Sequence, residues 1–333
     1  MLYDDILDGV LEEEGLGKAT KKSSIQLASS DEKISKKEKE QVDYIQSLKP
    51  IARDLWRSYQ SQNVYIDYSS KEIQNCYLLR YFIPYSNLLK QELDKLKIHE
   101  NINAFGGNNR ISNIDNFHAS FFGCGPAPEA LGLLEHLASC MSPSIENLSL
   151  NLFDINSSTW SHSISLIKKY VIDKKSKKTN IKAAEADFSS SKFWTESKSK
   201  KIKKSSLVVF QNCLNEINDS SKRDLVIENI GCVLFSMPKN SIIIFIDQPT
   251  NKYSSSTDYI LETIEAKAKE KNSTLKVLQT RKNNQFNCRS INGEMPGLIS
   301  NFLFYTGYNP SSEADCLMLR VNLEYSSLII QRQ

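Results

Sequence analysis

The sequence predicts an α/β fold in which a mostly parallel sheet carries helices on both faces, with an N-terminal helical module before it. Two observations predict this class. Short, nearly continuous apolar runs alternate with helical stretches over the later two thirds of the chain, as in parallel sheets covered on both faces. Between about residues 41 and 100, the apolar spacing is helical instead. With 333 residues, 40% of them hydrophobic, the chain can bury a large core without disulfides.

Residues 1–40 are predicted to be a flexible segment that carries one short acidic helix. Apolar residues within 2–11 recur at helical spacing among many acids, whereas residues 17–40 are rich in lysine and serine. Such a composition buries too little apolar surface to offset the entropy of ordering the chain. The short helix is either a docking element on a tether or a frayed terminus, and the whole segment is expected to be dispensable for the core.

Residues 41–105 are predicted to form a helical cap module. Apolar residues in its first part recur at steps of three and four, a second helix starts near Ser70, and a third covers residues 87–98. Pro84 is expected to interrupt the second helix, because proline lacks the backbone N–H that a helix interior needs. The sequence AFGGNNR at 104–110 is expected to close the module as a loop.

Residues 106–333 are predicted to form the α/β domain. The expected strands are 118–122, 148–153, 180–184, 207–210, 242–246 and 275–278. The helical stretches between them cover 128–139, 158–172, 223–236 and 257–271. Two further apolar stretches, 301–307 and 315–325, are candidates to complete the sheet, one of them antiparallel. The polar insert 281–300 is expected to be a loop that could act as a lid.

Composition argues against several classes of protein. Lysine plus arginine number 42 against 39 acids, so a strongly polycationic nucleic-acid binder is excluded. The seven cysteines form no C-x-x-C pair, which fits reduced thiols in a cytoplasmic protein better than a zinc ribbon or a disulfide scaffold. Four histidines without an H-E-x-x-H motif give no support for a metal site. No apolar run or leader pattern predicts contact with a membrane.

A lysine-rich stretch lies inside the α/β domain. It holds eleven lysines between Lys174 and Lys204. One interpretation is a basic patch that attracts RNA or another polyanion. The other is an ordinary solvated surface of loop and helix.

The strongest local signal is the sequence GCGPAP at 123–128, which follows an apolar strand and precedes an amphipathic helix. Gly123 and Gly125 allow a sharp turn and a close approach to a ligand. Pro128 suits the first turn of the helix. The loop would aim helix-terminal amides at a ligand above the carboxyl edge of the sheet, or it is a purely structural turn. Pro128 stands where a dinucleotide fingerprint needs its third glycine, so that fingerprint fails.

Two acids follow at the ends of the next two segments. Asp154 ends the second strand, where a carboxylate can accept both hydroxyls of a ribose. Asp187 ends the third, where an acid could accept the exocyclic amino group of an adenine. Either acid could instead be a solvent residue at the end of a strand.

These features together resemble the class I S-adenosylmethionine-dependent methyltransferases over roughly residues 75–280. The residues that carry the resemblance are GCGPAP at 123–128, Asp154, EADF at 185–188, VVFQNCLNEI at 208–217 and IIIFIDQP at 242–249. The family's usual acid two residues before the first glycine is Phe121 in this chain. The fold implied is Rossmann-like, and the cofactor implied is S-adenosyl-L-methionine.

The resemblance implies a role for each motif residue. Gly123, Cys124 and Gly125 would border the methionyl part of the cofactor, Asp154 and Ile155 its ribose, and Asp187 and Phe188 its adenine. Asn212 and Glu216 would lie at the methyl-transfer end as the catalytic candidates. Glu216 is the candidate base, or else it caps or salt-bridges the start of a helix. Tyr81 and Tyr85 could face the substrate from the helical module, or they pack in the core.

The methyl acceptor, whether small molecule, RNA or protein, is not specified by any motif. The sequence QNCLNEI at 211–217 is not the Asn/Asp-Pro-Pro-Tyr box of exocyclic-amine methylation, and Cys213 lacks the proline partner of cytosine C5 methylation. An active methyltransferase is the first interpretation. The second is a methyltransferase-like scaffold that binds the cofactor weakly or not at all and serves as a binding or assembly factor. A nicotinamide-dependent oxidoreductase is the least favoured, because the glycine fingerprint fails.

Overall fold

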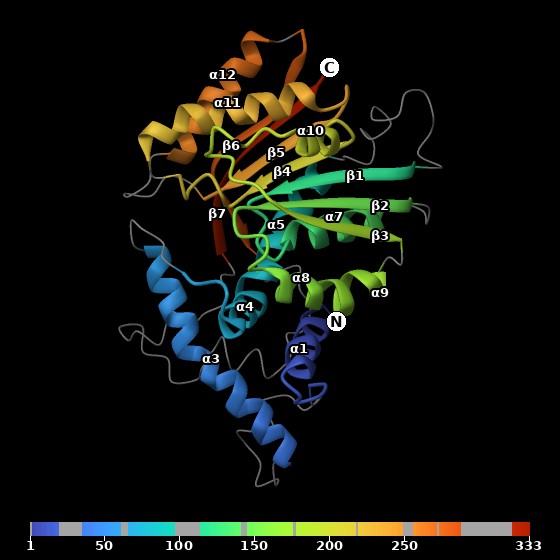
Figure 1. The fold of residues 1–333 in the computed structure, drawn as a ribbon, viewed down its shortest axis with the longest axis vertical. Coiled ribbons are helices and arrows are strands. Elements are labelled where there is room, and N and C mark those ends of the chain that lie inside the picture. Colours follow the sequence, from blue (N-terminus) through green and yellow to red (C-terminus); the bar gives the residue numbers. More distant parts are fainter. Residues whose placement is uncertain are drawn as a thin grey trace.

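The computed structural model describes most of the chain and shows a central twisted sheet with helices around it (Figure 1). The residues described are 2–19, 35–60, 66–96, 114–140, 145–175, 178–217, 219–248, 256–271, 273–287 and 322–333. The expected loop at 104–110 and the candidate strand at 301–307 lie outside these residues. Within the described part, no helix is long and apolar enough to cross a membrane.

The sheet has seven strands in the order β3-β2-β1-β4-β5-β7-β6. Their bounds are β1 Ile114–Phe122, β2 Ile145–Asp154, β3 Thr179–Glu185, β4 Leu207–Gln211, β5 Ile242–Asp247, β6 Leu275–Asn287 and β7 Asn322–Arg332. The first five strands are parallel, and β7 runs antiparallel to both β5 and β6. The predicted Rossmann-like class I methyltransferase fold is therefore confirmed. The strand order reverses between β1 and β4, which opens a crevice at their carboxyl ends.

Helices cover both faces of this sheet. The helices of the α/β domain are α7 Pro128–Cys140, α8 Ser161–Ile167, α9 Asp173–Lys175, α10 Glu196–Ile202, α11 Ser220–Ser236 and α12 Ser256–Glu270. Successive side chains of a strand point to opposite faces, so Phe121 joins the core under α7 and α8, and Phe122 joins the core under α11 and α12. β4 and β5 are buried along their whole length, which explains their continuous apolar sequences.

The N-terminal module consists of α1 Leu2–Glu13, α3 Lys36–Gln60, α4 Lys71–Tyr77 and α5 Ile83–Lys95. α1, α3 and α4 lie at the end of the molecule opposite α11 and α12 (Figure 1). The expectation that Pro84 interrupts the second helix is wrong. A π-helical turn, Leu78–Phe82, joins α4 to α5, and Pro84 sits in the first turn of α5. The widened turn accommodates a residue that cannot donate a backbone hydrogen bond.

The first helix belongs to the core, contrary to the expectation that residues 1–40 add nothing to it. The apolar side chains of α1 are buried in the same cluster as those of α5 and α8; they are Tyr3, Ile6, Leu7, Val10 and Leu11. Gly9 allows the close approach, because a Cβ there would lie 2.8 Å from the Tyr170 ring and 2.9 Å from Leu166. The expectation was based on the lysine-rich composition of residues 17–40, which lie after this helix. α3 begins at Lys36, so residues 36–40 are helical rather than linker.

The last two strands also depart from expectation. β6 runs to Asn287, so residues 281–287 are strand and not part of a lid. β7 runs from Asn322 to Arg332 and shares only its beginning with the candidate 315–325. β6 is an edge strand that pairs with β7 alone and contains register shifts, so its polar outer half faces solvent and its sequence resembles that of a loop.

Candidate functional site

A cavity of about 230 Å³ lies at the carboxyl ends of the central strands. It contains most of the residues that the sequence singled out: Gly123, Gly125, Asp154, Ile155, Asp187, Phe188, Asn212, Glu216 and Tyr85. These residues come from four strand ends and one helix of the N-terminal module. The structure thus brings the predicted site together, and the two predicted residues that do not line the cavity are Cys124 and Tyr81.

The glycine loop is held in a conformation that needs its glycines. Gly123 and Gly125 have φ values of +61° and +48°, in the left-handed region that disfavours side chains. The Gly123 N–H donates to the Phe153 carbonyl at 2.8 Å, which ties the loop to β2. A Cβ on Gly123 would overlap the Cβ of Cys213. The backbone at Gly123 therefore packs directly against the Cys213 side chain, where the first and fourth strands end beside the cavity.

Asp154 fixes the loop from the end of β2. One carboxylate oxygen accepts the Gly125 N–H and the other accepts the Asn156 N–H, both at 2.8 Å. Burial raises the pKa of Asp154, and these two hydrogen bonds oppose the rise. Each carboxylate oxygen can accept a further hydrogen bond, so the side chain can still receive hydroxyls of a ligand. Ile155 beside it is 53% exposed and forms part of the cavity wall.

The wall beyond β3 is formed by Asp187 and Phe188. The Asp187 carboxylate accepts the backbone N–H of Ser189 at 2.8 Å and its hydroxyl at 2.6 Å, which shapes the turn. Phe188 is buried edge-on against Phe210, with ring centroids 5.7 Å apart. A carboxylate next to an apolar ring at one end of the cavity suits a flat heterocycle with an amino group.

The exit of β4 is held by an acid that sequence reasoning missed. Asp247 at the end of β5 is fully buried and accepts N–H groups from Cys213 at 2.9 Å and Leu214 at 2.7 Å, while its other oxygen accepts that of Gln248 at 2.7 Å. Asn212 adopts a φ of +53°, and its N–H donates to the Ile246 carbonyl. Unusual backbone held by surrounding hydrogen bonds is common at functional sites. The missed signal is an acid directly after an apolar strand, as at Asp154.

The ionisable groups that line the described part of the cavity are mainly acidic. Its described lining contains three carboxyl groups and no lysine, arginine or histidine. Glu216 is exposed as a residue, but loss of hydration around its carboxyl, with the charges of Asp154 and Asp247 acting in the same direction, raises its pKa to about 7. Burial likewise raises the pKa of Asp247 to about 7, against the hydrogen bonds that it accepts. Such a cavity favours a ligand that carries positive charge.

Aromatic rings form the opposite wall. Tyr68 and Tyr77 lie 4.6 Å and 5.3 Å from Trp160, measured between ring centroids, and all three line the cavity. Tyr81 continues the row from Tyr77 at 5.2 Å to Tyr85 at 6.1 Å. Sequence reasoning missed Tyr68, Tyr77 and Trp160. The only sequence pattern that pointed to this wall was the four-residue spacing of Tyr77, Tyr81 and Tyr85.

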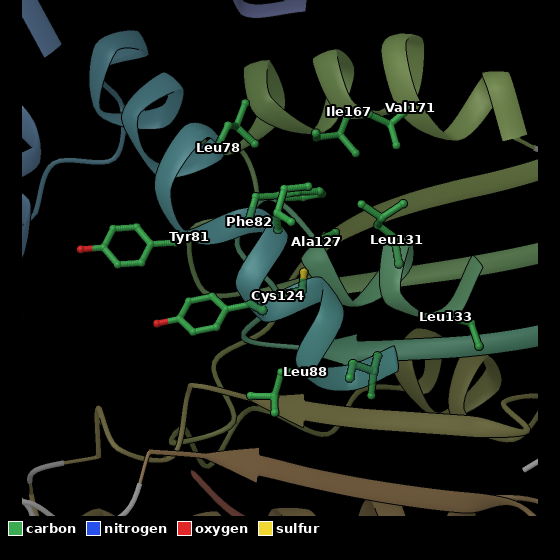
Figure 2. Packing of buried hydrophobic residues seen from close by; sticks show 14 of the residues in the cluster. Leu78, Tyr81, Phe82, Leu88, Cys124, Ala127, Leu131, Leu133, Ile167 and Val171 are labelled. Atoms are coloured by element: carbon green, nitrogen blue, oxygen red, sulfur yellow. The ribbon is translucent and has the colours of Figure 1, made fainter. Parts of the chain in front are cut away.

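Two predicted residues act differently from expectation. Figure 2 shows the sulfur of Cys124 inside the apolar cluster beside α5, and burial raises the pKa of its thiol. Only the main chain of Cys124 can therefore border a ligand. The Tyr81 ring lies at the edge of the same cluster with its hydroxyl pointing outward (Figure 2), and it supports the wall through Tyr77 and Tyr85. Among the described residues, no group of three metal-binding side chains lies together.

Comparisons with known proteins address the fold. No family model and no curated protein matches the chain. Among solved structures, it is similar to an O-methyltransferase family protein from Burkholderia thailandensis at 10% identity and a TM-score of 0.43, covering 97% of this chain and 81% of that one. A SAM-dependent methyltransferase from Methanosarcina mazei has 12% identity and a TM-score of 0.34, with coverage of 65% and 92%.

A third similar structure is the N-methyltransferase NodS from Bradyrhizobium japonicum in complex with S-adenosyl-L-homocysteine. It has 10% identity and a TM-score of 0.35, with coverage of 72% of this chain and 87% of that one. At such identities and TM-scores, these likenesses decide nothing about individual residues. The cavity is therefore interpreted from its own geometry and charge.

Proposed function

We propose that this chain is an S-adenosyl-L-methionine-dependent methyltransferase. The observation that carries the proposal is the cavity at the strand-order reversal, which has the glycine loop at its floor and carboxyl groups without a cation in its described lining. S-adenosylmethionine carries a sulfonium and an ammonium against one carboxylate, so its net charge is positive. Loop geometry, cavity position and charge all suit that ligand.

The cofactor would be held by the residues that border the cavity. Gly123 and Gly125, with the main chain of Cys124, leave room for its methionyl part. Asp154 and Ile155 would hold the ribose. Asp187 and Phe188 would hold the adenine, the carboxylate receiving the amino group and the ring contacting the base.

The bound cofactor supplies both the methyl group and its leaving group, so the protein has to orient the acceptor and exclude water. Asn212 and Glu216 lie at the β4 exit, where we place the reacting end. A carboxyl with a pKa of about 7 is well suited to take a proton from an acceptor near neutral pH, which supports Glu216 as the base. Tyr85 would contact the acceptor, and Tyr81 would support it from behind.

A methyl acceptor is predicted, and its class, whether small molecule, RNA or protein, is left open. The lysine-rich stretch, 174–204, contains the edge strand β3 and the helix α10, so a polyanionic acceptor would meet it there. Two of its lysines cover aromatic rings instead: Lys198 lies 5.4 Å from the Phe193 ring and Lys201 5.3 Å from Phe153. The cytoplasmic location also stays a prediction.

Calorimetric titration of the purified chain tests the proposal. S-adenosylmethionine and S-adenosylhomocysteine are expected to bind with one site each, and NADH is expected not to bind. Absence of binding by both sulfur compounds to folded protein would overturn the proposal and favour the scaffold interpretation. Binding of NADH alone would favour an oxidoreductase. Glu196→Gln, an exposed change on α10, serves as the control that leaves binding unchanged.

A further inference from the structure

A buried amide joins the N-terminal module to the loop between β2 and α8. Gln74 lies in α4 and is 2% exposed. Its amide nitrogen donates to the main-chain carbonyl of Tyr68 at 2.8 Å and to that of Thr159 at 2.6 Å. Its amide oxygen accepts the N–H of Ser163 at 3.0 Å and the Ser163 hydroxyl at 2.7 Å. The side chain therefore uses both of its donors and both of its acceptor positions.

These four hydrogen bonds connect two segments that are distant in the sequence. α4 lies beside α8 (Figure 1), and Thr159 and Ser163 are 85 and 89 positions from Gln74. A buried carbonyl that loses its donor costs more than the net gain of one hydrogen bond, so the two segments are held firmly to this one amide.

The two segments carry the aromatic wall of the cavity. Tyr68 is bonded to Gln74 through its own carbonyl, and Thr159 directly precedes Trp160. The rings of Tyr68 and Trp160 lie 4.6 Å apart, and both residues line the cavity. Tyr77, three positions after Gln74 in α4, lies 5.3 Å from Trp160 on its other contact. Gln74 thus fixes the backbone on both sides of the contact between Tyr68 and Trp160.

Trp160 in turn stands against the glycine loop. Its ring atoms Cε2 and Cζ2 lie 3.5 Å from the place that a Cβ on Gly125 would occupy, which is ordinary van der Waals distance. The residue is 4% exposed and precedes the first turn of α8, where its carbonyl accepts the Ile164 N–H at 2.9 Å. A shift of the backbone at Thr159 would therefore move the wall relative to the glycine loop.

We infer that Gln74 is a positioning residue, which holds Tyr68 and Trp160 where the ligand of the cavity contacts them. Gln74 is not among the residues that line the cavity, so it acts through the wall. The identity of the ligand, the cofactor, rests on the proposed function. Aromatic faces opposite carboxyl groups attract a cationic ligand, and a wall that is ordered before binding loses less entropy when the ligand arrives.

A role in stability alone is the alternative, and Gln41 in α3 provides the matched comparison. It is also a fully buried glutamine, and its amide nitrogen donates to the carbonyls of Leu16 at 3.0 Å, Gly17 at 3.3 Å and Lys18 at 2.9 Å. These four residues are not part of the cavity lining. Loss of either amide should lower the melting temperature, but only loss of Gln74 should weaken ligand binding.

Gln74→Glu is the main variant, measured at pH 8. It keeps the size of the side chain and an acceptor for Ser163, but it places a carboxylate oxygen against the carbonyls of Tyr68 and Thr159. Calorimetry should show about ten- to fiftyfold weaker binding of S-adenosylhomocysteine, with unchanged affinity in Gln41→Glu. Ser163→Ala removes one of the four hydrogen bonds, so it should weaken binding about two- to fivefold and keeps the test valid if Gln74→Glu folds poorly.

A double-variant cycle tests whether Gln74 acts through Trp160. Trp160→Ala removes the ring and should weaken binding by itself. Adding Gln74→Glu to it should then weaken binding by less than about threefold more, because the ring that Gln74 positions is already gone. A role in overall stability would make the two losses multiply.

The emission of Trp160 provides a measurement that needs no ligand. The chain has three tryptophans, so Trp160 is the only one left in a Trp56→Phe, Trp194→Phe background. Gln74→Glu in this background should shift the emission to longer wavelength and increase quenching by acrylamide, because the buried ring gains access to solvent. Gln41→Glu should change neither.

The outcomes separate this inference from the proposed function. If wild type binds S-adenosylhomocysteine and both Gln74→Glu and Ser163→Ala bind it equally tightly, the inference is wrong and the proposed function stands. Equal losses in Gln41→Glu and Gln74→Glu, or losses that multiply in the cycle, would also overturn it. Unchanged Trp160 emission in Gln74→Glu would overturn it without any ligand. If wild type binds neither S-adenosylmethionine nor S-adenosylhomocysteine, the proposed function itself fails.

Discussion

Gly123→Ala tests the packing on which the whole cavity depends. The new Cβ would overlap the Cβ of Cys213 and lie 3.1 Å from its sulfur. The loop cannot move aside freely, because the Gly123 N–H is bonded to Phe153 and the Cys213 N–H to Asp247. The φ of +61° adds a backbone penalty for any residue with a side chain. We therefore expect lower stability and weaker cofactor binding together.

The magnitude follows from these two contributions. Forcing an extra methyl group into a packed site costs about 1–3 kcal/mol. A left-handed backbone costs a non-glycine residue about 1–2 kcal/mol. The free energy of unfolding should therefore fall by about 2–5 kcal/mol, with a loss of roughly 2–4 °C in melting temperature for each kcal/mol. Affinity for S-adenosylhomocysteine should fall at least about tenfold, because the loop that holds it shifts.

Thermal melts, urea unfolding and calorimetry measure these effects. Cys213→Gly removes the clashing atoms, so the double variant should recover the steric part, with a coupling of about 1–3 kcal/mol. Gly231→Ala in α11 is the control, since no described atom lies within 4 Å of its new Cβ, and it should stabilise the chain by about 0.5–1 kcal/mol. A Gly123→Ala protein with wild-type melting and affinity would refute the reasoning.

Four further predictions follow from the same structure. Asp154→Ala should lower cofactor affinity about ten- to a hundredfold in calorimetry, since it removes a charged acceptor; normal affinity with a lower melting temperature would indicate a structural role only. Deleting residues 1–13 should lower the melting temperature clearly, because five buried side chains of α1 leave the core; an unchanged melt would contradict that packing. Burial raises the pKa of Asp247 from 3.8 to about 7, so the stability that its protonated form contributes is present below about pH 4 and is lost as the pH rises through 7. Asp247→Asn should therefore make the melting temperature depend less on pH between about pH 4 and 7. Glu216→Gln should weaken S-adenosylmethionine more than S-adenosylhomocysteine at pH 8, because only the former carries the sulfonium charge; equal losses would move Glu216 away from the reacting end.

The central strands were predictable because both of their faces are buried. Residues 242–246 of β5, for example, are all apolar because the strand is buried on both faces, and β4 has the same buried pattern. β6 was only half predicted for the opposite reason. Its outer part, 281–287, lies at the edge of the sheet, and its residues 281–285 are polar and exposed or half-buried, so composition alone cannot separate it from a loop.

The burial of α1 was not predictable from the chain near it. Its apolar spacing correctly indicated a helix, but spacing does not reveal what the apolar face contacts. The partner surface, which includes Leu166 and Tyr170, lies more than 150 residues away in the sequence. Charged pairs complete the contact, with Lys169 bonded to Glu13 at 3.0 Å and Lys174 to Asp5 at 2.6 Å. Lys174 of the predicted lysine-rich stretch thus pairs with Asp5 of the predicted acidic helix.

The candidate site likewise has one part that the sequence predicts and one part that it does not. The glycine loop and Asp154 were predictable, because the end of a parallel strand at a strand-order reversal is a fixed place for a ligand. The aromatic wall was not, since Tyr68, Tyr77 and Trp160 meet only after the N-terminal module folds onto the sheet. Side chains that converge from elements distant in sequence leave no local pattern.

Two features near the cavity that destabilise the free protein bear on the choice between an active methyltransferase and an empty scaffold. Ala127 holds a φ of +64°, which glycine would tolerate at no cost, and the buried Oε2 of Glu129 accepts no hydrogen bond within the described structure. Both features destabilise the free protein, and each could be relieved by a single substitution. A scaffold gains nothing from them, whereas a ligand with a positive charge is attracted by the three carboxyl groups of the cavity lining and can stabilise the strained loop beside it. The physical expectation is therefore a free protein that is less stable than its fold allows and that gains stability when a cationic ligand fills the cavity.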